Sequence, residues 1–167
     1  VDIDVRWAKF RRERGASAAR GLAHKIAGSA GTKTVGTGVA SAGQPLLHAF
    51  PDRIAKARGK PGQFLLANGS GAELDPTHYL AAKPWLVIAD MQGSADRMRI
   101  TSAAEVDETT ILSTMSSTLQ TLDECVFDIS SRSLRRRRLT RIGAIVMSEQ
   151  TLQPPSGDLA DAAMLAA

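Results

Sequence analysis

The strongest chemical feature of the sequence is a run of arginines toward its C-terminal end. Residues 132–141 contain six of them: Arg132, Arg135, Arg136, Arg137, Arg138 and Arg141. On a regular strand, Arg136 and Arg138 point to one face, and Arg135, Arg137 and Arg141 point to the other. Both faces cannot be core, so we expect the first half of this strand to project beyond the body of the fold. Guanidinium groups bind phosphate oxygens in a bidentate manner, which relieves their mutual repulsion.

Two interpretations of this run stay open. The arginines contact the backbone of a nucleic acid, or they form a solvated β-ribbon that protects a sheet edge. The residues alone do not separate these possibilities. Lys60, in the turn Lys60-Pro61-Gly62, joins the six arginines as a candidate phosphate contact.

Two glycine-rich stretches raise the question of nucleotide chemistry. Residues 64–76 (FLLANGSGAELDP) contain Gly-Ser-Gly, but the third glycine of a dinucleotide fingerprint is missing and Pro76 stops any helix. A hairpin turn at Asn68 and Gly69 fits better. Residues 27–34 end like a P-loop, but Thr32 and Ala27 replace both glycines that would wrap the phosphates. Neither stretch predicts nucleotide hydrolysis.

The remaining polar residues form no catalytic or metal-binding pattern. No metal spacing relates the three histidines, which are His24, His48 and His78. Asp90 and Asp96 flank a hairpin that we expect at 91–95, and turn chemistry explains them. Cys125 follows Glu124 in an apolar run, which favours a buried structural thiol. We therefore expect no catalytic residue, cofactor or metal in this chain.

The composition predicts a folded protein with an anionic partner. The chain has 167 residues, 43% of them hydrophobic and 4% aromatic, and a net charge of +4. A single cysteine excludes an internal disulfide and favours a reducing compartment. No apolar run approaches the ~18 residues of a membrane helix, and no signal peptide is visible, so we expect no membrane partner and a cytoplasmic protein. A first residue that is Val, and a last stretch resembling a helix cut short, suggest a piece of a longer protein.

The periodicity predicts an α+β fold. Residues 1–27 form a helical segment, with one helix expected over 3–27, and residues 28–45 form a flexible linker or loop. Residues 46–155 are rich in short β-prone runs, with one inserted helix that Asp107 caps. This order predicts a small β-barrel of the oligonucleotide-binding (OB) type. Residues 156–167 begin a C-terminal helix.

Residues 50–92 also carry a family resemblance. Four segments look like the region that follows the motor in the HrpB helicases of the bacterial DEAH/RHA group: Phe50 to Ala55, Phe64 to Ala72, Leu74 to Pro76, and Pro84 to Asp90. Arg135–Arg138 and the following Leu139 to Met147 resemble the arginine-rich strand of that family. The resemblance covers about residues 46–155, and residues 1–27 are similar to the end of the preceding helical bundle. Ser70 departs from the family, which usually has arginine there, and this removes one possible phosphate contact.

The resemblance implies a function for the whole protein. It would couple ATP hydrolysis to movement along RNA or to its remodelling, with ATP and Mg²⁺ on motor domains absent from this chain. The piece with this sequence would be a non-catalytic accessory region that contacts single-stranded RNA and the motor domains of the same polypeptide. Since few aromatics are available for stacking, we expect weak, salt-sensitive and sequence-indifferent binding through phosphates. The alternative is a protein-docking module without RNA contact.

Overall fold

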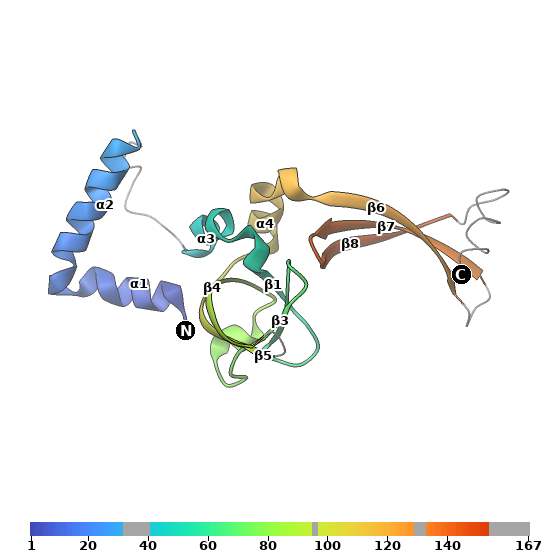
Figure 1. Ribbon diagram of the computed structural model, residues 1–167, viewed down its shortest axis with the longest axis horizontal. Helices are drawn as coiled ribbons and strands as arrows, with labels where there is room; N and C mark the ends of the chain where they lie inside the picture. Colours follow the sequence, from blue (N-terminus) through green and yellow to red (C-terminus); the bar gives the residue numbers. More distant parts are fainter. Residues whose placement is uncertain (32–40, 95–96, 129–132, 154–167) are drawn as a thin grey trace.

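The computed structural model describes residues 1–31, 41–94, 97–128 and 133–153. Figure 1 shows three parts in a row: a pair of N-terminal helices, a β-barrel with helices beside it, and a long twisted sheet that reaches away from the barrel. The predicted α+β class, with N-terminal helices before an OB-like barrel, is confirmed. Arg132, Asp96, residues 32–40 of the linker predicted at 28–45, and the helix start predicted at 156–167 lie outside the described residues.

The N-terminal part contains two helices where one was predicted. Helix α1 (Ile3–Arg12) begins at Asp2, whose Oδ1 accepts a hydrogen bond from the Val5 N–H at 2.9 Å. The chain becomes extended at Glu13 (ψ 135°), passes through a 3₁₀ turn (Arg14–Ala16) and continues as α2 (Ser17–Ser29). Gly15 lies at this break, and glycine is a poor helix former. Asp2 also bridges to Ala103, which ties α1 to the barrel.

Five strands close the barrel: β1 (Ile54–Ala57), β2 (Gln63–Leu66), β3 (Gly71–Glu73), β4 (Trp85–Ser94) and β5 (Arg97–Glu105). They pair in the order β1-β2-β3-β5-β4, and only β3 and β5 run parallel. The turn at residues 64–76 is the predicted hairpin: Gly69 has φ +90°, and the Asn68 side chain accepts from the Ser70 N–H at 2.9 Å. The hairpin predicted at 91–95 is also present, but residues 91–94 belong to β4 rather than to its turn, and Asp90 pairs with Ser102 within the strand ladder.

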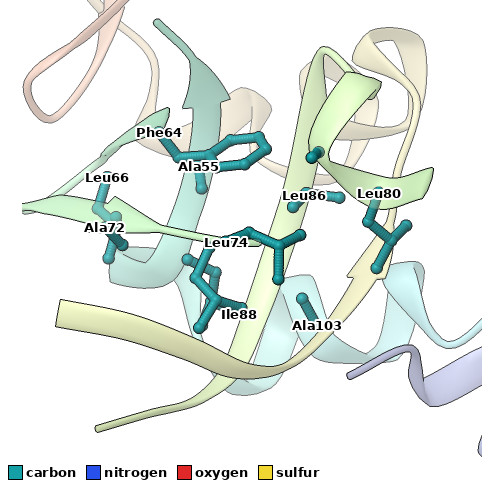
Figure 2. Close-up of a cluster of buried hydrophobic side chains, with 11 residues drawn as sticks. Ala55, Phe64, Leu66, Ala72, Leu74, Leu80, Leu86, Ile88 and Ala103 are labelled. Atoms are coloured by element: carbon teal, nitrogen blue, oxygen red, sulfur yellow. The ribbon is translucent and has the colours of Figure 1, made fainter. Parts of the chain in front are cut away.

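Two hydrophobic cores lie on opposite sides of the barrel wall. Inside it, small and branched side chains from all five strands meet, and Figure 2 labels Ala55, Phe64, Leu66, Ala72, Leu74, Leu80, Leu86, Ile88 and Ala103 among them. Alternate residues of the same strands, including Ile54, Trp85 and Val87, point outward into the second core. Strands β1 and β4 are apolar on both faces because both faces are covered.

Helices cover the outer face of the barrel at the second core. Helix α3 (Gly43–Ala49) contributes Leu47, and a 3₁₀ turn (Pro51–Arg53) leads into β1. Helix α4 (Glu108–Thr114) contributes Ile111 and begins at Asp107 as predicted; a further 3₁₀ turn (Ser116–Thr118) follows it. Between β3 and β4, a 3₁₀ helix (Tyr79–Ala82) inserts Leu80 into the barrel interior.

The last three strands form a separate sheet, which we call the arm: β6 (Gln120–Asp128), β7 (Ser133–Ile142) and β8 (Ile145–Leu152), in the order β6-β7-β8. The barrel was predicted over residues 46–155, and this is wrong for β6, β7 and β8, which form a sheet of their own. The pairing of β1 with β4 closes the barrel and leaves no edge to which further strands could add. The arm projects from the barrel as a twisted ribbon (Figure 1).

The turn between β7 and β8 attaches the arm to the barrel. The Ala144 N–H donates to the Ala67 carbonyl at 2.8 Å, and the Lys56 ammonium donates to the Val146 carbonyl at 2.7 Å. Gly143 has φ +53°, and a Cβ there would lie 2.1 Å from the Ala67 oxygen, so only glycine fits. Leu139, Ile142 and Ile145 are buried at this end of the arm, and the latter two belong to the second core.

Candidate nucleic-acid interface

Strand β7 displays its arginines on both faces of the arm. Arg138 lies opposite Asp123 of β6, and Arg137 lies opposite Glu124. Directly opposed residues share one face of an antiparallel pair, so consecutive arginines point to opposite faces. The structure confirms the predicted two-face display and the predicted projection beyond the barrel.

Carboxylates of the flanking strands engage three of these arginines. Arg138 Nε lies 2.7 Å from Asp123 Oδ1, and Arg136 Nη2 lies 3.2 Å from Asp123 Oδ2. On the other face, Arg137 bridges both neighbouring strands, at 2.9 Å from Glu124 and 3.2 Å from Glu149. Sequence reasoning did not foresee these pairs, because it could not know which strands flank β7.

The ion pairs shift the titration of both partners. The hydrogen bond from Arg138 and the positive charges of Arg138 and Arg136 lower the pKa of the Asp123 carboxyl. Hydrogen bonds to Glu149 and then to Glu124 raise the pKa of the Arg137 guanidinium. A guanidinium is charged at any ordinary pH, and the paired carboxylates reduce the repulsion between neighbouring arginines.

The arm carries little net charge. Residues 120–128 and 133–152 contain five arginines and four carboxylates, a net charge of +1. The pairs are accessible, with 40% and 48% of the Arg137 and Arg138 side chains exposed. Exposed ion pairs contribute little to stability, because solvent screens them. A guanidinium has five donors, so a phosphate can share or replace these carboxylates.

Lys60 lies away from the arginines of the arm, and Cys125 is not buried. Lys60 is exposed in the β1–β2 turn, at the opposite end of β2 from Ala67, where the arm is attached; the structure does not bring it together with the arginines. Cys125 is exposed, so the prediction of a buried thiol was wrong. The reason is that β6 belongs to the two-faced arm, which has no core at this distance from the barrel.

The N-terminal helices carry a stronger positive charge than the arm. Residues 1–31 contain seven lysines and arginines and three carboxylates, a net charge of +4: Arg6, Lys9, Arg11, Arg12, Arg14, Arg20 and Lys25 against Asp2, Asp4 and Glu13. Two of the carboxylates are turned inward. Asp2 is buried at the start of α1, and Asp4 accepts from the Ala42 N–H at 2.6 Å and from the Ser41 hydroxyl at 3.1 Å. These cations are not among the site residues that were predicted from the sequence.

The part of the chain that the structure describes offers no metal site: it holds no group of three or more His, Cys, Asp or Glu residues close enough to share an ion. His78 instead caps the 3₁₀ helix, since its Nδ1 accepts from the Leu80 N–H at 3.2 Å. Among the same residues, no helix has the length and apolar character needed to cross a membrane.

The chain resembles known proteins in both sequence and structure. No family model matches it. The ATP-dependent RNA helicase HrpB of Escherichia coli strain K12 is 38% identical over 124 residues, which are 72% of this chain and 15% of that protein. The crystal structure of the E. coli DExH-box NTPase HrpB superimposes with a TM-score of 0.77 and 29% identity over 99% of this chain and 20% of that one. In sequence and in structure, the chain corresponds to a segment of HrpB.

A second HrpB structure, of the E. coli DEAH/RHA helicase, matches with a TM-score of 0.57 and 32% identity over 72% of this chain and 15% of that one. The chain thus spans about one fifth or less of the HrpB proteins it matches. The resemblance of residues 50–92 to the HrpB helicases is confirmed. The helices, the barrel and the arm therefore correspond to one part of the HrpB proteins.

Proposed function

We propose that this chain is the nucleic-acid-binding accessory region of an ATP-dependent RNA helicase, and that it contacts RNA phosphates beside a motor formed by other domains of the same polypeptide. ATP and Mg²⁺ would act on those domains. The observation that carries the proposal is the exposed display of guanidinium groups on both faces of β7, outside a barrel whose strands need no further partner.

The contact would work by exchange of partners. A phosphate oxygen approaching the arm would take N–H donors of Arg136, Arg137 and Arg138 that now point to carboxylates. Charge-assisted bidentate pairs with phosphate replace similar pairs with carboxylate, so the net gain for each contact is small. Binding is then weak and salt-dependent, and it ignores sequence because the phosphates carry no base information. Arg132 and Lys60 would add contacts at their own positions.

Fluorescence anisotropy of a labelled single-stranded RNA tests the proposal, at low and moderate salt. The variant with Arg135, Arg136, Arg137 and Arg138 changed to alanine should lose affinity. It should also lose up to about three units of the slope of log K against log salt, at about 0.7 for each contact with a single strand. A matched variant, Asp123→Asn with Glu149→Gln, removes the carboxylate that pairs with Arg136 and Arg138 and one of the two that pair with Arg137, and it should bind more tightly than wild type. No detectable binding by wild type at low salt would refute the proposal.

A protein-docking role is the second candidate, and the geometry of Arg137 favours it. This guanidinium already lies between two carboxylates, Glu124 and Glu149, so the arm accommodates acidic side chains well. Here the acidic surface would belong to the motor domains or to a regulator. Loss of co-purification with separately expressed motor domains in the four-alanine variant, with RNA binding unchanged, would support this role over RNA contact.

A further inference from the structure

We propose that helix α1 is a second contact for single-stranded RNA, in which one base stacks on Trp7 and the flanking phosphates meet the cations of α1. The inference rests on the proposed function, because it assigns a further site for the same ligand. It does not depend on the arginines of the arm.

The aromatic part of the site is an exposed indole held in place. Trp7 stacks on Phe10, with ring centroids 5.8 Å apart and an interplanar angle of 24°, and 42% of Trp7 is exposed. Trp85 and Phe64 are buried in the two cores, whereas Tyr79 is also exposed, at 51%, and stacks on His78. A tryptophan oriented by a stacked neighbour has already lost much of its rotational freedom, so it offers a base a flat surface at low entropic cost.

The space beside this indole is large enough for a base. A hollow of about 610 Å³ lies between α1 and β5, lined by Trp7, Phe10, Ile3, Arg6, Lys9, Glu13 and Ser102. Apolar ring surface forms its wall, and two cations lie on its rim with Glu13 as the single carboxylate among the lining residues. The Ser102 hydroxyl, from β5, adds a polar group that can donate or accept.

Charge complementarity identifies the occupant as an anionic chain. Arg6, Lys9, Arg11 and Arg12 are exposed on α1, and no ion pair engages them within the residues whose side chains the structure describes. Asp2 and Asp4 are held inward by backbone N–H groups and cannot neutralise them. A positive groove combined with a stacking aromatic is the arrangement by which proteins bind single strands without sequence preference. An apolar or acidic protein surface would match only the rings or only the cations.

Tryptophan fluorescence separates this site from the rest of the molecule. Trp85 is 4% exposed with the Lys56 ammonium over its ring, whereas Trp7 is accessible, so the two report on different places. In a Trp85→Phe chain, titration with oligo(U) should quench the remaining Trp7 emission. In a Trp7→Phe chain, the remaining Trp85 emission should not change. Anisotropy with the same RNA runs in parallel.

Affinity measurements keep the test valid if Trp85→Phe folds poorly. Trp7→Ala should weaken binding at least about five-fold with an unchanged salt slope, because stacking releases no counterions, and Trp7→Phe should retain most of the affinity. Arg6→Ala with Lys9→Ala should instead reduce the salt slope by about one unit. An RNA with an abasic site in every position should bind wild type and Trp7→Ala equally.

The outcomes distinguish the two proposals. If RNA binds by anisotropy but Trp7→Ala binds as wild type and Trp7 is not quenched, the α1 site is refuted and the proposed function stands. If wild type binds no RNA at all, both proposals fall. If quenching persists in the four-alanine arm variant, α1 binds RNA independently of the arm.

Discussion

Gly143 should be the most sensitive point of the junction between arm and barrel. Its φ of +53° is a left-handed conformation, and a Cβ would lie 2.1 Å from the Ala67 carbonyl oxygen and 2.9 Å from its carbon. Since both contacts are with backbone, Gly143→Ala can only be accommodated if the turn moves away from the barrel. That movement breaks the 2.8 Å hydrogen bond from Ala144 to Ala67 and loosens the buried Ile142 and Ile145.

Gly59 provides the matched control for this substitution. It also has a left-handed conformation (φ +71°), but an added Cβ would come no nearer than 3.9 Å to the flexible Gln63 side chain. Both alanine variants incur the cost of a left-handed non-glycine residue, about 1–2 kcal/mol. Only Gly143→Ala adds the overlap and the lost hydrogen bond, which together cost about 2–4 kcal/mol more.

Urea denaturation of the two variants measures the difference. With an m-value of about 2 kcal/mol/M, the midpoint of Gly143→Ala should lie about 1–2 M below that of Gly59→Ala at an unchanged slope. Equal midpoints would refute the reasoning, because they would mean that the β7–β8 turn is not held against Ala67. A decrease in the m-value of Gly143→Ala alone would mean that the arm separates before the barrel unfolds.

Three further predictions follow from single contacts. Hydrogen bonds from Thr109 and Thr110 lower the pKa of Asp107 from 3.8 to about 2. The stability that the Asp107 carboxylate contributes is therefore complete above pH 4 and is lost as the pH falls toward 2. Asp107→Asn should remove this part of the acid transition in a pH series of thermal melts. Ile145→Ala, at a fully buried side chain in the second core, should lower the free energy of unfolding by about 2–5 kcal/mol, whereas Leu122→Ala, at a side chain 46% exposed on the arm, should change it by less than about 1 kcal/mol in urea. Cys125 should react with a thiol reagent in the native protein at nearly the rate of the unfolded chain, and slow reaction would contradict its exposure.

Local chemistry was enough to predict several features of the fold. Asn68 and Gly69 predicted a hairpin because glycine accepts a positive φ and the asparagine side chain bonds to the backbone two residues on. Asp107 predicted the start of α4 because its carboxylate can accept from the free N–H groups of a first turn. The period of two along residues 135–141 predicted arginines on both faces of a strand. Each of these depends on residues within a few positions of one another.

The partners of distant strands could not be predicted in the same way. The sequence placed β6 and β7 in the barrel, because nothing local indicates that β1 and β4 pair and close it without them. Because β6 was predicted to lie in the barrel, Cys125 was predicted to be buried, whereas it is exposed. For the same reason, the sequence did not reveal that Glu124 and Glu149 lie on either side of Arg137. Glu149 lies on β8, which pairs with β7.

The sequence by itself thus determined the OB-like class, the local turns and caps, the resemblance to HrpB and the presence of a two-faced arginine strand. Tertiary structure alone decided that this strand stands on a separate arm, between strands whose carboxylates pair with its arginines, and that Trp7 on α1 is exposed. The physical reason is that turns and caps are set by short-range hydrogen bonds. Net surface charge and exposure depend on which side chains from remote segments are brought together, as with Lys56 and Val146, ninety positions apart.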